Sequence, residues 1–246
     1  CCSSAASDVY KRQVLLRDVR SRLRLTRRQM EAQVEGLPVP DGDAYLRREE
    51  LMAPLQMLDR SLRAVGLSDI ADGDLKNTLR RLNCFGITLL RLDIRQESTR
   101  HSEVLDAITR YLQLGSYNDW DEAARQAFLV DELQARRPLI DATFRDSEHC
   151  TPEVAEVLAT CEVIAEQGSE GLGAYVISMA TTPSDVMAVM LLQKIAGVRE
   201  PMRVVPLFET LDDLDGAEQT MSALLALPFY RERVAAGQEV MIGYSD

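Results

Sequence analysis

One carboxylate stands at the end of a predicted buried strand, where the next helix does not need it. In the stretch RVVPLFETLDD, residues 203–213, the apolar run Val204–Phe208 stops at Glu209. Three later acids suit the first turn of the following helix, where negative charge is favoured: Asp212, Asp213 and Asp215. Glu209 comes one step too early for that position, so its carboxylate is a candidate for chemistry.

Other polar groups end the remaining predicted strands: Arg95, Ser178 and Asp246. Mg²⁺ in proteins takes one or two carboxylates and completes its coordination with water and substrate oxygens. An arginine grips a phosphate or a carboxylate with its planar guanidinium. Glu209 and Asp246 beside Arg95 would therefore suit a small, highly anionic substrate. The competing interpretation is that the acids cap helices and Arg95 pairs with one of them, because structural ion pairs also occur at such places.

The elements that must position these groups alternate between strand and helix. Strands are predicted at 87–98, 173–180, 203–209 and 239–246. Helical segments between them indicate parallel strands with helical crossovers. The predicted fold is therefore α/β: a partial (β/α)8 barrel of about four parallel strands, whose chemistry lies at the carboxyl ends of the strands. A doubly wound sheet is the rival topology, but no G-x-G-x-x-G follows any strand.

Local signals set the predicted helix boundaries in this half. Helices are predicted at 102–114, 119–134, 151–168, 181–197 and 211–228. Thr151 is the expected N-cap of the third, with Pro152 at its first position and Gly168 as its stop. The fourth is expected to begin at Thr182 or Ser184 and to stop at Gly197.

The chain divides into three predicted parts. Residues 1–13, CCSSAASDVYKRQ, are small, polar and without periodicity, and are interpreted as a non-native segment derived from adapter sequence. Residues 14–84 form a large additional helical region, whose first two helices stop at Gly36 and Gly66. Residues 85–246 form the partial barrel, truncated at the fourth strand of this chain.

Composition excludes several classes of protein. With 46% apolar residues and a net charge of −11, the chain is predicted to be soluble and globular and is not expected to bind nucleic acid. Its one basic stretch, residues 19–29, is interpreted as a solvated helix face or a partner contact. No apolar run approaches the roughly 18 residues that a membrane span needs. Cys84, Cys150 and Cys161 lie in or beside apolar segments and show no C-x-x-C spacing, so buried free thiols in a reducing compartment, the cytoplasm, are expected.

Four segments resemble phosphoenolpyruvate carboxylase, in the same order along the chain. They are FGITLLRLDIRQESTRH (85–101), AYVISMATTPSDVMAV (174–189), VVPLFETLDDL (204–214) and VMIGYSD (240–246). The resemblance extends from Val14 to Asp246. It implies an enzyme that carboxylates phosphoenolpyruvate with bicarbonate to give oxaloacetate and phosphate, an anaplerotic reaction that feeds the tricarboxylic acid cycle. It also implies a divalent metal cofactor, Mg²⁺ with Mn²⁺ as the alternative, and a homotetrameric parent.

The resemblance assigns roles to five positions of this chain. Glu209 in F-E-T and Asp246 in G-Y-S-D match the family's metal ligands. Arg95 in D-I-R-Q-E-S matches a catalytic arginine that binds phosphoenolpyruvate. Leu207 and Met241 match apolar, substrate-binding positions around the CO₂ intermediate. Strand alternation lets Leu207 face the same way as Glu209, whereas Met241 has the opposite parity to Asp246 and needs a bulge to do so.

Other groups of the family are not found in these residues. The T-A-H-P-T-E block with the catalytic histidine, the active-site lysine and the glycine-rich H-G-R-G-G loop are missing, so this chain by itself is expected to be inactive. As an isolated polypeptide a half-barrel is also expected to aggregate or to pack loosely. His101 is interpreted as a structural hydrogen-bonding residue, and His149 has no assigned role.

Two other functions remain open at this point. One is a different Mg²⁺-dependent lyase or phosphomutase on a phosphoenolpyruvate/pyruvate barrel, which the many helices before residue 85 disfavour. The other is a non-catalytic helical scaffold whose strand ends only bind an anion.

Overall fold

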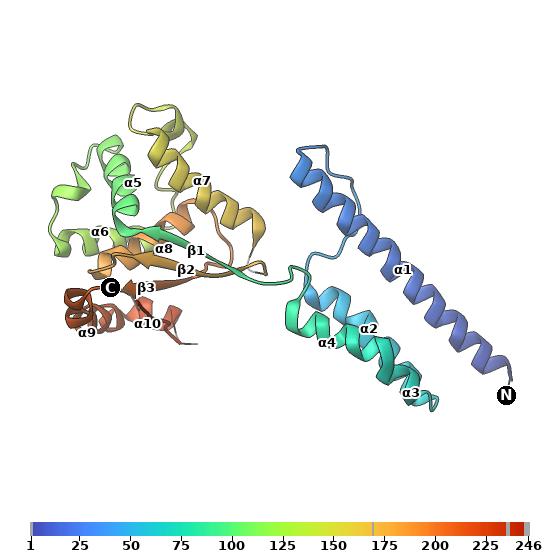
Figure 1. The fold of residues 1–246 in the computed structure, drawn as a ribbon. Helices are drawn as coiled ribbons and strands as arrows, with labels where there is room; N and C mark the ends of the chain where they lie inside the picture. The colour runs from blue at the N-terminus through green and yellow to red at the C-terminus, as the bar shows by residue number, and fades with distance from the viewer. Residues whose placement is uncertain (1, 169, 235–236, 244–246) are drawn as a thin grey trace. The chain divides into compact units, whose positions relative to one another are not determined.

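The computed structural model describes residues 2–168, 170–234 and 237–243, which form two compact units, Cys1–Leu90 and Arg91–Asp246 (Figure 1). Within these residues, no helix has the length and apolar character needed to pass through a membrane.

The first unit is helical. Its helices are α1 (Cys2–Glu35), α2 (Arg48–Ala64), α3 (Ser68–Ile70), a π-helical turn η1 (Ala71–Leu75) and α4 (Lys76–Phe85). A small core joins α1, α2 and α4, made of Val19, Tyr45, Leu51, Leu55 and Leu82. The predicted stops are confirmed, since Gly36 and Gly66 both have positive φ directly after or near a helix end. Helix α1 begins at Cys2, so residues 2–13 are helical although their sequence shows no helical periodicity.

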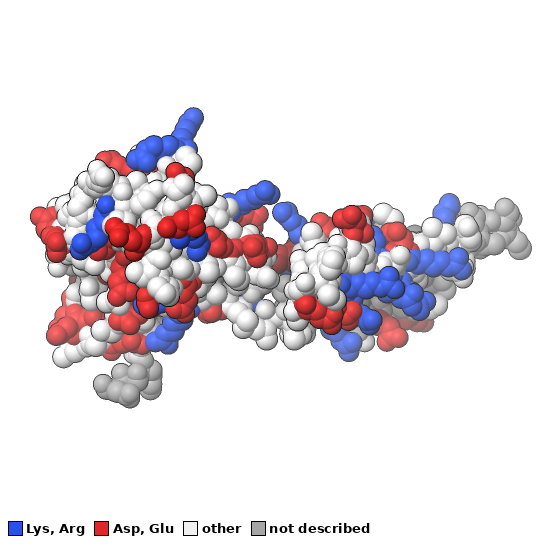
Figure 2. Space-filling view, turned by 90° about the horizontal axis from the view of Figure 1, so that it is seen from above, with Lys and Arg blue, Asp and Glu red and all other residues white. Residues whose placement is uncertain are grey.

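The basic stretch of the sequence lies on α1, and basic side chains gather on the first unit in Figure 2. Arg20, Arg24 and Arg28 are exposed. Arg22 is the exception, because its guanidinium pairs with Asp43 and lies 4.0 Å from the centre of the Tyr45 ring. Most of the stretch is therefore exposed on this unit, as both a solvated helix face and a partner contact require.

The second unit is built on one sheet of four parallel strands, which confirms the predicted α/β class. The strands are β1 (Leu92–Glu97), β2 (Leu172–Ser178), β3 (Arg203–Phe208) and β4 (Met241–Ile242). Their order in space is β1-β2-β3-β4, the same as their order along the chain. Successive βα units of a singly wound sheet follow this order, whereas a doubly wound sheet reverses it at a switch point.

Two predicted strands are shorter than expected. The first was expected from residue 87, but β1 begins at Leu92 because Leu89 has a left-handed backbone with φ of 72° and Ile87 packs into the core of the first unit. The fourth was expected over 239–246, and β4 pairs only through Met241 and Ile242. Residues 244–246 lie outside the described residues.

The helices of the second unit are α5 (Ser98–Tyr111), α6 (Glu122–Gln134), α7 (Pro152–Gln167), α8 (Pro183–Ile195), α9 (Leu211–Ala226) and α10 (Pro228–Arg233), with short 3₁₀ turns η2 (Tyr117–Asp119) and η3 (Ala142–Asp146). Helix starts follow the predicted capping chemistry. Thr151 accepts a bond from Val154 N at 3.4 Å, and Thr182 caps α8 in a capping box with Asp185. Ser184, the other predicted cap, instead donates to Glu122.

Both faces of the sheet are apolar. On one face Tyr175, Ile177 and Val204 pack into the large core that the helices share. On the opposite face the alternate residues form a second cluster: Ala174, Val176, Val205 and Leu207, with Met241 packed against them. Strands that bury both faces are typical of parallel sheets. Arg95 and Glu209, at the carboxyl ends of β1 and β3, lie at the edge of this second cluster.

Candidate functional site at the strand ends

Arg95 and Glu209 meet at the carboxyl end of the sheet. Arg95 lies opposite Val176 in the β1–β2 register, which places its side chain on the face of the second apolar cluster. Its Nη2 donates to Glu209 Oε1 at 2.8 Å. The Arg95 side chain is 58% exposed and that of Glu209 27%, so solvent screens the pair and a ligand can reach it.

Glu209 lies between the last residue of β3 and the first turn of α9. Thr210 is the N-cap of α9, and Asp213 completes the capping box by accepting bonds from Thr210 N at 3.0 Å and Glu209 N at 3.3 Å. The bond from the Thr210 backbone holds the pKa of the Asp213 carboxyl below its usual value. Asp213 therefore does the capping that the sequence assigned to the later acids, and the Glu209 side chain has no part in it.

Strand β4 brings Gly243 into contact with Glu209. Gly243 N donates to Phe208 O at 2.8 Å, which extends the β3–β4 pairing by one residue beyond Ile242. A Cβ added to Gly243 would lie 2.6 Å from Glu209 Cγ. Gly243, three positions before Asp246, therefore lies beside Glu209, but Asp246 itself lies outside the described residues. The distance between the two predicted metal ligands stays a matter of prediction.

Leu207 and Met241 lie side by side next to these groups. They are partners in the β3–β4 register, and Met241 packs against the cluster that contains Leu207. Leu207 is 2% exposed. The structure thus places both predicted apolar residues on the face of the sheet that also carries Arg95, so one wall of the site is apolar.

The end of β2 contributes a left-handed residue that the sequence does not reveal. Met179 has φ of 56°, which few residues other than glycine adopt, and its carbonyl accepts from Ser98 Oγ at 2.7 Å. Ser178, the predicted strand-end residue, pairs with Glu97 in the register. Sequence reasoning also missed Gly243, whose one signal is a glycine at the predicted end of a strand.

The carboxylates of the described residues do not gather into a complete metal-binding group. No group of three or more His, Cys, Asp or Glu side chains there could hold a metal ion. Glu209 offers a carboxylate whose Oε1 is bound by Arg95, and its oxygens are of the hard kind that Mg²⁺ and Mn²⁺ prefer. The donor chemistry of Glu209 fits these ions.

His101 lies on the opposite, helix-covered side of the sheet. Tyr175 donates its hydroxyl proton to Gln96 Oε1 at 2.9 Å, which leaves its oxygen to accept from His101 Nε2 at 2.9 Å. His101 is fully buried, and burial lowers its pKa to about 4. A neutral imidazole in the helix core agrees with the structural role predicted for it.

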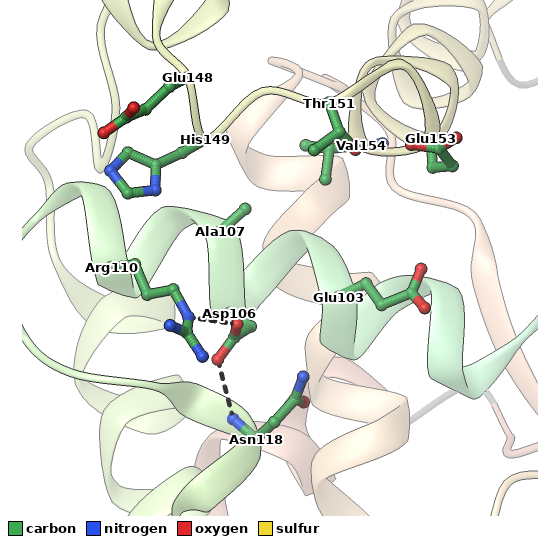
Figure 3. A pocket seen from close by; sticks show the side chains of 10 residues that line it. All are labelled: Glu103, Asp106, Ala107, Arg110, Asn118, Glu148, His149, Thr151, Glu153 and Val154. Atoms are coloured by element: carbon green, nitrogen blue, oxygen red, sulfur yellow. Dashed lines mark hydrogen bonds and ion pairs between the residues drawn. The ribbon is translucent and has the colours of Figure 1, made fainter.

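His149 lies in a hollow of about 470 Å³ between α5 and the start of α7, apart from the strand ends (Figure 3). Its walls carry Glu103, Asp106, Arg110 and Glu148. Asp106 is held by Arg110 and by the backbone of Asn118, and the hydrogen bonds of Ser116 and Arg110 keep its pKa low although burial opposes them. None of the predicted site residues lines this hollow.

Comparisons with known proteins agree with the resemblance of the motifs. A family model described as phosphoenolpyruvate carboxylase matches residues 3–246. The phosphoenolpyruvate carboxylase of Alcanivorax borkumensis is 96% identical over 233 residues, which cover 95% of this chain and 26% of that protein. That of Marinobacter nauticus is 53% identical over 235 residues, covering 96% and 26%. One from Escherichia coli O1:K1 / APEC is 51% identical over 243 residues, covering 98% and 27%. The chain thus spans about a quarter of the length of these curated relatives.

Proposed function

Because the chain belongs to the phosphoenolpyruvate carboxylase family, we propose that it is the part of a longer enzyme that carboxylates phosphoenolpyruvate with bicarbonate, giving oxaloacetate and phosphate. The observation that carries the proposal is the Arg95–Glu209 pair at the carboxyl end of a parallel sheet, beside the apolar Leu207 and Met241. A charged pair and an apolar surface adjoin there. The reaction needs both, because phosphoenolpyruvate is anionic and CO₂ is uncharged.

Arg95 is the group that would bind the substrate. Within the described residues its guanidinium makes one hydrogen bond, from Nη2 to Glu209, and more than half of its side chain is exposed. A guanidinium has five donors, so a phosphate or carboxylate can be bound bidentately by those that remain. Its fixed positive charge would neutralise negative charge on the substrate throughout the reaction.

Glu209, together with Asp246, would hold Mg²⁺ or Mn²⁺. When bound, such an ion supplies a Lewis acid that stabilises negative charge developing on substrate oxygens. The backbone of Glu209 is fixed by Asp213, and its carboxylate is fixed by Arg95, so the ligand is already oriented before an ion arrives.

Leu207 and Met241 would exclude water from the reacting carbon. Their side chains offer no hydrogen bond, so CO₂ released beside them is not hydrated by the wall of the site, and an enolate there meets no proton donor from it. The family's histidine and lysine would come from outside these residues, and the chain alone is expected to show no turnover.

The remaining expectations belong to the same proposal. We assign residues 85–246 to part of a (β/α)8 barrel, residues 14–84 to a helical region and residues 1–13 to a non-native segment, and we expect a homotetrameric parent in the cytoplasm. The sequential order of the four parallel strands supports the barrel. The parent is a carboxy-lyase in this proposal, and the comparisons do not favour a different lyase or phosphomutase on such a barrel, or the scaffold.

The decisive experiment uses the full-length enzyme that contains this segment. Oxaloacetate should form from phosphoenolpyruvate only when bicarbonate and a divalent metal are both present, as measured by coupling to malate dehydrogenase and NADH. Consumption of phosphoenolpyruvate that is independent of bicarbonate would support a lyase or phosphomutase instead. No consumption by a folded, metal-loaded full-length protein would overturn the proposal.

A further inference from the structure

Glu209 is held in place from three different elements. Its backbone N–H donates to Asp213 of α9, its carboxylate accepts from Arg95 of β1, and the stem of its side chain lies against Gly243, which follows β4. The first two contacts are hydrogen bonds, which tolerate small changes of geometry. The third is a steric contact and tolerates less.

Among the described residues, the three atoms that lie nearest to a Cβ built on Gly243 all belong to Glu209. A Cβ at position 243 would lie 2.6 Å from Glu209 Cγ and 3.0 Å from both its Cα and its Cβ. Real Cβ atoms do not approach other atoms as closely as 2.6 Å, and one of the neighbours is backbone that cannot swing away. A methyl group there must therefore displace Glu209, β4 or both.

Backbone conformation does not explain the glycine. Eight described glycines have positive φ, as turns and helix ends require, and Gly243 is not among them. Its N–H bond to Phe208 O would also survive in alanine. What glycine provides at this position is the absence of a side chain.

We propose that Gly243 is a positioning residue for the metal site. Because Gly243 has no side chain, the aliphatic part of Glu209 fits against it, and the carboxylate points to Arg95 and to the incoming ion. The proposal rests on the proposed function, because it takes Glu209 as a metal ligand. Groups that orient a metal ligand typically change metal affinity by about 10- to 100-fold when they are lost.

The test compares two Gly→Ala variants of the full-length enzyme. Gly243→Ala adds a methyl group against Glu209, whereas Gly216→Ala adds one inside α9 where no atom lies within 4 Å. Mn²⁺ binding without substrate is measured by electron paramagnetic resonance. The dissociation constant should rise about tenfold or more in Gly243→Ala and stay unchanged in Gly216→Ala. Wild-type Mn²⁺ affinity in Gly243→Ala would overturn the proposal.

A double-mutant cycle covers the case in which Gly243→Ala folds poorly. If the methyl group meets Glu209, the loss of thermal stability caused by Gly243→Ala should be smaller in a Glu209→Ala background, which removes Cγ. An equal loss in both backgrounds would show that position 243 acts through something else, and the proposal would fail. This readout needs no metal. If instead Glu209→Gln leaves Mn²⁺ binding unchanged while the cycle shows coupling, the proposed function fails and the contact stands.

Discussion

Arg95 of β1 and Glu209 after β3 form an ion pair across the end of the intervening strand β2, with Nη2 and Oε1 2.8 Å apart. The two residues are assigned to different ligands, an anionic substrate and a cation. In the protein without ligands each satisfies the charge of the other, and the guanidinium donors and the carboxylate oxygen outside this bond are the groups proposed to meet the two ligands.

Replacing Arg95 by lysine in the full-length enzyme should raise KM for phosphoenolpyruvate by about 10- to 100-fold, the equivalent of the roughly 1.5–3 kcal/mol that a charged hydrogen bond contributes. Lysine keeps the charge but loses the planar fork. The matched control is Arg100→Lys in α5, which disrupts a surface pair with Glu156 and should leave KM unchanged. Equal KM values for Arg95→Lys and wild type would contradict the role given to Arg95.

Glu209→Gln keeps the shape of the side chain and removes its charge, so Mn²⁺ should bind about tenfold more weakly or worse, a loss of at least about 1.4 kcal/mol. Calorimetric titration of the apo full-length enzyme measures this directly. Asp212→Asn removes an exposed acid from the first turn of the adjacent helix and serves as the control. A similar loss in both variants would point to a general electrostatic effect rather than coordination.

Leu207→Ala should uncouple the reaction. An enlarged, wetter pocket lets CO₂ escape and lets the enolate take a proton, so more phosphate is released than oxaloacetate is formed. The ratio of the two products is independent of how much enzyme is folded, which matters because such truncations cost about 2–5 kcal/mol. Val205→Ala loses side-chain volume in the same cluster, farther from the strand end, and should keep a ratio of one. Full coupling in Leu207→Ala would exclude this role for Leu207.

Acid should lower the free energy of unfolding of the helix core around His101. Its folded pKa of about 4 lies below the unfolded value of 6.5, so the unfolded chain binds the proton first and stability falls as the pH drops through this window. Between pH 7 and pH 5 the loss should be about 2 kcal/mol. This loss can be measured by amide hydrogen exchange of peptides from α5 and β2, with the exchange rates corrected for the pH dependence of intrinsic exchange. In His101→Gln this part of the pH dependence should disappear, while from pH 7 to 8 both proteins should behave in parallel.

Cys161 should resist alkylation in the native protein. Its side chain is fully buried in the large core, and burial raises the pKa of its thiol to about 12, so almost no thiolate exists at neutral pH. Cys84 is exposed and Cys150 is half-buried, so the burial expected for these two thiols from their apolar neighbours was wrong, and Cys84 should react with iodoacetamide. Peptide mass spectrometry before and after denaturation separates the two, and rapid native labelling of Cys161 would show that the core opens.

Local features of the fold could be predicted from the sequence, and long-range contacts could not. The caps at Thr151 and Thr182 depend on a few neighbouring residues, so the starts of α7 and α8 were correct. The helix predicted from residue 102 begins earlier, at Ser98. The extent of the first strand was wrong because β propensity does not reveal the left-handed turn at Leu89. Alternation along β3 placed Leu207 and Glu209 on one face, but it gave no partner for either.

The candidate site shows the same limit. Pairing of Arg95 with one of the strand-end acids was considered, yet the choice of Glu209 follows from the order of three strands. The contact between Gly243 and Glu209 depends on the β3–β4 register, which no single segment determines. Motif resemblance supplied roles for these residues, and only the sheet shows which of them touch.

The long segment between β1 and β2 should make ligand affinity at the strand ends sensitive to substitutions far from the site. Arg95 and Glu209 are 114 positions apart, and most of the intervening chain is the helical segment from α5 to α7. Closing so long a loop costs conformational entropy that the docking of β1 on β2 must offset. Substitutions that weaken the packing of the segment from α5 to α7 should therefore shift β1 toward an undocked state. They should reduce ligand affinity at the strand ends although they lie outside the site.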